Sequence, residues 1–176
     1  MVRFPAIYRR LAALAQRRLP NPRSRLRRAI LRRGNISGWA AFNRGDFELM
    51  LVRYAPDVEF EFDPGLQTLD LSGTFRGHQG ILDGLRQLAD GFPLRFEPAY
   101  VLDLGDRVLA LGFQRAQGRA SGVELEQEFA QLVTVREGLV ARDQAWFTWE
   151  EGLRAAGLDP DFLALPSREK LGSSAE

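Results

Sequence analysis

Residues 94–149 read LRFEPAYVLDLGDRVLALGFQRAQGRASGVELEQEFAQLVTVREGLVARDQAWFTW and predict most of the architecture. They contain four runs rich in β-branched, aromatic and other apolar residues, over 94–104, 107–118, 123–136 and 139–149. The joints between the runs carry glycine beside acidic or small residues, which is typical of hairpin turns. We therefore predict an antiparallel meander of four strands.

The third run places two glutamines on an apolar face. Side chains alternate between the two faces of a strand, so Glu124, Glu126 and Glu128 share one face. The opposite face carries Val123, Leu125, Gln127, Phe129, Gln131, Val133 and Val135. Buried amides without partners are costly. We expect Gln127 and Gln131 to border a cavity, where they donate to a ligand carbonyl or pair with each other or with water.

The segment before the meander predicts two helices, two strands and a third helix. Ser37 is positioned to cap a helix through Phe42, and Asp46 a second helix through Tyr54. Alternation over 58–62 predicts a strand that pairs with 69–75, and Gly77 precedes an amphipathic helix over 78–90. A short helix over 150–156 follows the meander. Helices segregated from strands indicate an α+β fold. We expect the sheet to be strongly curved and cone-shaped, with helices on its concave side.

The N-terminus is a basic arm. Residues 1–45 hold 12 of the 24 Lys and Arg residues and none of the 23 acids. Apolar residues at helical spacing predict a helix before Pro20-Asn21-Pro22 and another over 24–33, ended by Gly34. We divide the chain into an arm over 1–33, a domain over 34–158 and a tail over 159–176. The arm is expected to be dispensable for folding.

Four interpretations of the arm remain open. It binds an anionic membrane surface, neutralises the phosphates of a nucleic acid, folds against the acidic body of this or another chain, or precedes the true translation start. Composition limits the chemistry available to the chain. The chain has no cysteine and one histidine, which excludes disulfides and predicts neither a metal site nor a cofactor. A cytoplasmic location is expected, because no apolar run is long enough to span a membrane.

Local strings over about residues 30–158 resemble the SnoaL-like polyketide cyclase family of the nuclear transport factor 2-like superfamily. The resemblance rests mainly on turn and cap residues, which are, in chain order, Phe42-Asn43-Arg44-Gly45-Asp46, Tyr54-Ala55-Pro56-Asp57-Val58-Glu59-Phe60, Phe75-Arg76-Gly77-His78-Gln79-Gly80, Leu104-Gly105-Asp106-Arg107-Val108, Arg136-Glu137-Gly138 and Ala155-Ala156-Gly157-Leu158. It implies the cone-shaped fold, a pocket for a small apolar molecule, and a homodimer through the outer face of the meander.

The same resemblance locates candidate catalytic positions. The carboxylate base of the isomerases in this superfamily falls on Phe62, with Asp63 one residue away, and their acidic oxyanion donor falls on Gln131. A one-residue shift along a strand reverses the direction of the side chain, so Asp63 serves as a base only if a bulge restores it.

Further candidates come from the residues themselves. Asp143 faces inward on the last strand with Ala145 and Phe147, and burial would raise its pKa as a general base requires. We expect it instead to pair with Arg115 on the adjacent strand, and if both line the pocket, this pair binds or polarises a polar group of the ligand. His78 is a candidate proton shuttle beside the interpretation of a capping residue. Trp39, Phe62, Phe129 and Phe147 are candidate aromatic contacts of a ligand.

Two functions follow. The first is an acid–base enzyme of isomerase, cyclase or hydratase type that acts on an apolar carbonyl or polyketide-like compound. The second is a non-catalytic module for ligand binding or dimerisation, with the basic arm contacting anionic partners. Phe62 stands at the base position and Gln131 in place of an acidic donor. These residues argue against isomerase chemistry and to that extent favour the second, non-catalytic function.

Overall fold

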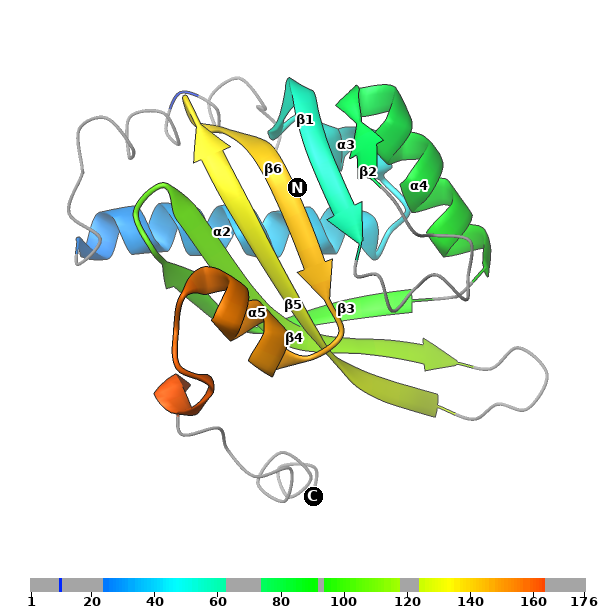
Figure 1. Ribbon diagram of the computed structural model, residues 1–176. Coiled ribbons are helices and arrows are strands. Elements are labelled where there is room, and N and C mark those ends of the chain that lie inside the picture. The colour runs from blue at the N-terminus through cyan, green and yellow to red at the C-terminus, as the bar shows by residue number, and fades with distance from the viewer. Residues whose placement is uncertain (1–9, 11–23, 63–73, 92–93, 118–123, 164–176) are drawn as a thin grey trace.

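A six-stranded mixed sheet carries the architecture (Figure 1). The computed structural model describes residues 10, 24–62, 74–91, 94–117 and 124–163. The strands are β1 (Tyr54–Phe62), β2 (Thr74–Arg76), β3 (Leu94–Asp103), β4 (Arg107–Gln117), β5 (Glu124–Arg136) and β6 (Leu139–Trp146). The helices are α2 (Arg25–Phe42), α3 (Phe47–Leu51), α4 (Gly77–Gly91) and α5 (Trp149–Ala156), followed by the 3-10 turn η2 (Pro160–Leu163). The predicted α+β class is confirmed.

The sheet has the order β2-β1-β6-β5-β4-β3. The four strands β3 to β6 form the predicted antiparallel meander, and β1 lies parallel to β6. Glu137 and Gly138 turn the chain between β5 and β6 with positive φ angles of 54° and 82°. Two positive φ angles are typical of the two-residue turn that matches the twist of adjacent strands.

Three helices pack on the concave face of the sheet, as predicted, and α5 packs on the outer face. Figure 1 shows α2 and α5 on opposite sides of the strands. Helices α2, α3 and α4 join the concave face in the larger core cluster. Helix α5 buries Leu109, Leu111, Ala130 and Leu132 of the outer face. The predicted homodimer therefore has less of that face available.

Helix α2 runs through the predicted domain boundary. It continues without interruption from Arg25 to Phe42, so neither the predicted stop at Gly34 nor the cap at Ser37 exists. The Ser37 hydroxyl donates within the helix to the Gly34 carbonyl, 2.8 Å away. The N-cap is Ser24, whose hydroxyl accepts from the Arg27 backbone N–H. The predicted boundary before residue 34 thus falls inside one helix.

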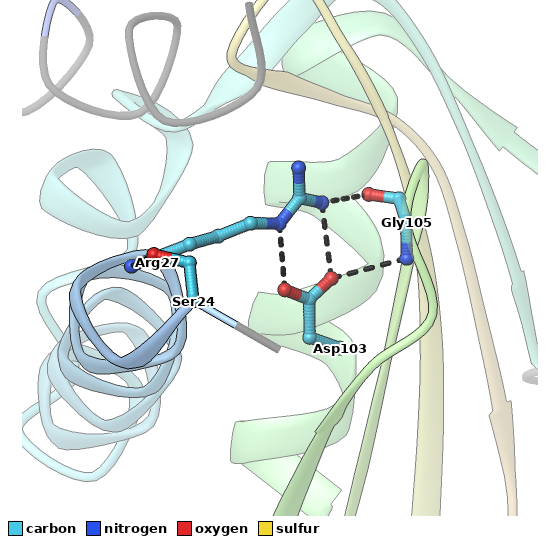
Figure 2. Close-up of polar contacts among 4 residues, drawn as sticks. All are labelled: Ser24, Arg27, Asp103 and Gly105. Atoms are coloured by element: carbon cyan, nitrogen blue, oxygen red, sulfur yellow. Dashed lines mark hydrogen bonds and ion pairs between the residues drawn. The ribbon is translucent and has the colours of Figure 1, made fainter. Parts of the chain in front are cut away.

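An ion pair ties the N-terminal half of α2 to the sheet (Figure 2). Arg27 Nε and Nη2 donate to the Asp103 carboxylate over 2.6 and 3.0 Å, and both side chains are 3% exposed. Nη2 also donates to the Gly105 carbonyl, while the Gly105 N–H donates to Asp103. With Leu31 in the core, residues of the predicted arm are part of the packed body.

The remaining boundaries agree in part with prediction. Asp46 caps α3 as predicted, and Gly45 before it has a positive φ of 71°. However, α3 ends at Leu51, and Tyr54 begins β1 instead of ending a helix. Most of the arm, most of the predicted strand over 69–75 and the end of the tail lie outside the described residues. Within the described part, no helix is both long and apolar enough to cross a membrane.

Candidate functional site

A pocket lies between the concave face of the sheet and the helices α2, α3 and α4. It encloses about 560 Å³ of space between atoms, including the part open to solvent. Its lining is dominated by apolar and aromatic side chains, the composition typical of small-molecule sites. The lining residues are Asn35, Gly38, Trp39, Phe42, Met50, Arg53, Tyr54, Phe60, Phe62, Leu85, Leu88, Phe96, Phe129, Gln131, Val133 and Val140.

Four aromatic rings form one wall. Trp39 contacts the rings of Phe96 and Phe129 edge-to-face, with centroids 5.0 and 4.7 Å apart, and Phe42 meets Phe96 at 4.8 Å. Asn43 fixes α2 against β3, because its side-chain amide exchanges two hydrogen bonds of 2.9 Å with the Phe96 backbone. The aromatic wall is therefore fixed in two ways, by the Asn43 hydrogen bonds at the C-terminal end of α2 and by packing between the rings.

A buried carboxyl lies beneath this lining. Asp143 is 0% exposed, and its strand neighbours Phe60 and Val133 both line the pocket. The Tyr54 hydroxyl donates to Asp143 Oδ2 over 2.5 Å, and Gln131 Nε2 donates to the same oxygen over 2.8 Å. Both donors line the pocket, so Asp143 is one side chain away from it.

Burial shifts the proton affinity of this pair. Desolvation raises the pKa of Asp143 to about 7, although hydrogen bonds from Tyr54 and Gln131 and the charge of Arg53 act in the opposite direction. Desolvation also raises the pKa of Tyr54 well above its ordinary value, and the Asp143 charge adds to that rise. Near neutral pH, Asp143 thus exists in both protonation states while Tyr54 remains a donor.

Three polar atoms around the pocket have no hydrogen-bond partner among the described residues. They are Asn35 Oδ1, Trp39 Nε1 and Asp143 Oδ1, all buried. Buried polar groups are normally satisfied, so a donor and two carboxyl or amide oxygens without partners indicate a place for a polar ligand or water.

The structure brings together four of the predicted ligand contacts and separates others. Trp39, Phe62, Phe129 and Gln131 line the pocket. Phe147 packs against the core but does not line the pocket. Gln127 is exposed, and its Oε1 accepts from Gln114, so its predicted place at the cavity is wrong.

The predicted pairing of Asp143 with Arg115 is also wrong. Arg115 is 51% exposed and binds Glu126 and Glu97. It lies opposite Glu126 on β5, whereas Asp143 lies opposite Val133, seven positions further along that strand. At about 3.3 Å per residue the two are more than 20 Å apart along the sheet. The positive charge that acts on Asp143 comes from Arg53.

The two remaining catalytic candidates are His78 and Asp63. His78 is the second residue of α4, and its Nε2 lies 3.0 Å from the Tyr54 backbone carbonyl, an arrangement that fits a loop-fixing residue. Asp63 lies outside the described residues. No group of three or more potential metal ligands occurs in the described segments.

Sequence reasoning missed Asn35, Arg53 and Tyr54. Asn35 directly follows the predicted helix stop at Gly34, and the sequence pattern puts Tyr54 at the end of a helix. Tyr54 is the first residue of β1, and the parallel pairing of β1 with β6 brings it to Asp143. The polar residues Arg53-Tyr54 before an alternating strand were the available signal.

Comparisons with known proteins place the fold. An NTF2-like protein of Burkholderia pseudomallei is 23% identical over 69% of this chain and 93% of its own, with a TM-score of 0.60. TerC, crystallised with polyporic acid, is 25% identical over 71% and 96%, also with a TM-score of 0.60. A Catenulispora acidiphila protein with a ketosteroid isomerase-like fold, in complex with trimethylamine, is 16% identical over 72% and 94%, with a TM-score of 0.53.

No curated protein matches the chain. The family model of the SnoaL-like domain matches residues 38–143, which include every lining residue of the pocket except Asn35 and end at the buried Asp143. With the fold and the family model in agreement, the chain belongs to the SnoaL-like domain family.

Proposed function

We propose that the pocket binds a small, largely apolar carbonyl compound and that Asp143 exchanges a proton with it. The observation that carries the proposal is a fully buried carboxyl with a pKa near neutrality, hydrogen-bonded to two residues that line an aromatic pocket. A group whose pKa lies near the working pH can both take and return a proton, which is the requirement for general acid–base catalysis.

The hydrogen bonds give the proton a route. In its ionised form Asp143 takes a proton from an acidic C–H or O–H of the ligand, at Oδ1 or through Tyr54. On the second route the Tyr54 hydroxyl passes its own proton to Oδ2 as it receives one from the ligand. The resulting carboxylic acid returns the proton to a different ligand atom. No net proton is gained or lost, as in an isomerisation or an intramolecular ring closure.

The developing negative charge on the ligand oxygen needs donors in the pocket. Trp39 Nε1 lines the pocket and has no partner in the described residues, so it is available as such a donor. Donors fixed before the reaction stabilise an enolate without reorganisation. TerC, crystallised with polyporic acid, supports small organic molecules as the ligand class of this fold.

The test is solvent deuterium incorporation at carbon atoms next to a carbonyl, because it detects the proton step without knowledge of the product. A panel of cyclic ketones and 1,3-diketones is incubated with the protein in D₂O and followed by proton NMR. We expect catalysed exchange that rises through pH 7 and is reduced at least about a hundredfold in Asp143→Asn and more weakly in Tyr54→Phe.

The matched control is Asp57→Asn. Asp57 is an exposed carboxylate on β1 that binds Arg136 over 2.7 Å and does not line the pocket. Its replacement should leave exchange unchanged. Exchange that is equal in Asp143→Asn and the unaltered protein would refute the proposal, as would a well-folded protein that catalyses no exchange on any compound.

One observation favours a second function, binding without catalysis. Phe62 lines the pocket at the position where the resemblance implies a catalytic carboxylate, and Asp143 reaches the pocket only beside other side chains. Under this function, panel compounds shift the thermal midpoint of the protein while deuterium exchange stays at the uncatalysed rate.

A further inference from the structure

A second cavity adjoins the pocket. It encloses about 410 Å³ of space between atoms, including its open part, between the first half of α2 and the end of the sheet near the β5–β6 turn. It shares Asn35, Arg53, Val133 and Val140 with the first pocket. Asn35 and Arg53 thus stand at a junction between the two spaces.

The permanent charge in the lining of the two cavities lies at this junction. Of the described residues that line the two cavities, Arg53 alone bears a permanent charge, and the others are apolar or neutral polar. Its influence extends inward, because its positive charge acts on both Asp143 and Tyr54. In surroundings of low dielectric constant such a charge attracts an anion far more strongly than in water.

The local structure holds this guanidinium in place. The Arg53 carbonyl accepts from the Val140 N–H over 2.8 Å, which fixes the backbone beside β6. Gly38 on α2 faces the side chain, and a Cβ at that position would collide with Arg53 Nη1. Trp39, the next residue of the helix, has its Nε1 without a partner in the described part of the chain, which adds a neutral donor.

We propose that the ligand is an amphipathic organic acid bound as its anion, with an apolar ring system among the aromatic side chains and its carboxylate at Arg53. This inference rests on the proposed function and narrows its ligand class to carbonyl compounds that also carry a negative charge. The second cavity gives the carboxylate, or the chain that bears it, room on the far side of the junction.

Proton uptake accompanies binding of the anion. Asp143 faces Tyr54 on β1, Gln131 on β5 and the charge of Arg53 from the turn before β1, while His78 of α4 contacts the Tyr54 backbone. An anion at Arg53 offsets the one charge that favours ionised Asp143. The carboxyl therefore takes up a proton, and affinity for the anion falls as the pH rises from 7 to 9.

The test compares two probes of equal shape, 2-naphthoate and 2-naphthamide, by isothermal titration calorimetry with the full chain. The naphthoate stays ionised over this pH range, and the amide is neutral. At pH 6.5 we expect the anion to bind about tenfold tighter or more. Titrations in buffers of different ionisation enthalpy should show proton uptake for the anion and none for the amide.

Variants assign the preference to Arg53. Arg53→Gln should remove the difference between the probes, and Arg53→Lys should keep most of it. Gly38→Ala displaces the guanidinium without removing its charge. It should weaken binding of 2-naphthoate more than binding of 2-naphthamide. The control is Arg142→Gln, an exposed arginine that binds Glu61 on the outer face, which should change neither affinity. Circular dichroism checks that each variant is folded.

The outcomes separate the two proposals. Equal affinity of the two probes in the unaltered protein, or an equal loss for both in Arg53→Gln, refutes the anion preference alone. Absence of deuterium exchange with preserved anion preference refutes the catalytic proposal alone. Binding of neither probe overturns this inference directly.

Discussion

Replacing Asp143 by asparagine should stabilise the protein at alkaline pH and much less in acid. Asparagine resembles the protonated carboxyl, because its Oδ1 can accept from both Tyr54 and Gln131, as Asp143 Oδ2 does. The unaltered protein must instead ionise a carboxyl that is 0% exposed once the pH passes its pKa of about 7. The variant avoids that cost.

The magnitude follows from linkage. An aspartate in the unfolded chain titrates at about 3.9, roughly three units below the folded value. A raised folded-state pKa gives stability that is complete below the unfolded pKa and is lost as the pH rises to the folded pKa. About 1 kcal/mol has been lost at pH 4.5 and about 4 kcal/mol at pH 8. The difference in unfolding free energy between variant and parent should therefore grow by about 3 kcal/mol across this interval.

The assay is urea unfolding of both proteins at pH 4.5 and pH 8, followed by tryptophan fluorescence. Taking the difference in unfolding free energy between variant and parent cancels the contributions of the titratable groups that the two proteins share. The control Asp57→Asn should move in the opposite direction and by less, because the hydrogen bond from exposed Arg136 lowers the pKa of Asp57. A variant-minus-parent difference that is the same at both pH values would refute the argument, since Asp143 would then be ionised in the fold throughout.

The remaining predictions concern the N-terminal half of α2. Arg27→Met leaves the buried Asp103 carboxylate without its cation and should cost about 3–5 kcal/mol in urea unfolding, much of which the double replacement with Asp103→Leu restores. A chain that begins at Ser24 should melt within a few degrees of the full chain, as measured by calorimetry. A chain that begins at Gly34 loses Arg27 and Leu31 and should melt far lower or be insoluble. This result is the opposite of what the sequence led us to expect, that residues 1–33 are dispensable for folding. Equal midpoints for the two truncated chains would support the original expectation.

Apolar runs and turn residues were sufficient to predict the meander, and alternation was sufficient to predict the inward face of β5, but neither predicted that β1 lies parallel to β6. Phe129, Gln131 and Val133 line the pocket because a buried face fixes which way a strand points. We also expected Arg115 and Asp143 on neighbouring strands, but β5 lies between β4 and β6. Arg115 pairs with Glu126 and Asp143 with Val133, so the two side chains lie on opposite faces of the sheet and seven positions apart along it.

Tertiary contacts explain the error at Gly34. A glycine inside a helix costs about 1 kcal/mol relative to alanine, and a sequence pattern counts it as a stop. Burial of Leu31 and Trp39 on either side, and the bonds of Arg27 to the sheet, outweigh that cost. None of these contacts is local in sequence, so periodicity could not supply them.

The energetics of Asp143 support the proposal that this site exchanges protons with a ligand. Folded domains are stable by only about 5–15 kcal/mol, so a carboxyl that costs about 4 kcal/mol at pH 8 is a large burden. Nothing in the packing requires the charge, because asparagine would keep the bonds to Tyr54 and Gln131. Two of the polar groups that line the pocket are a phenol held protonated and an arginine for which Gly38 leaves room. Strain and unmatched polar atoms concentrate at functional sites, where a local loss of stability serves binding or catalysis. The cost at Asp143, one side chain away from an aromatic pocket, supports the proton exchange that we propose.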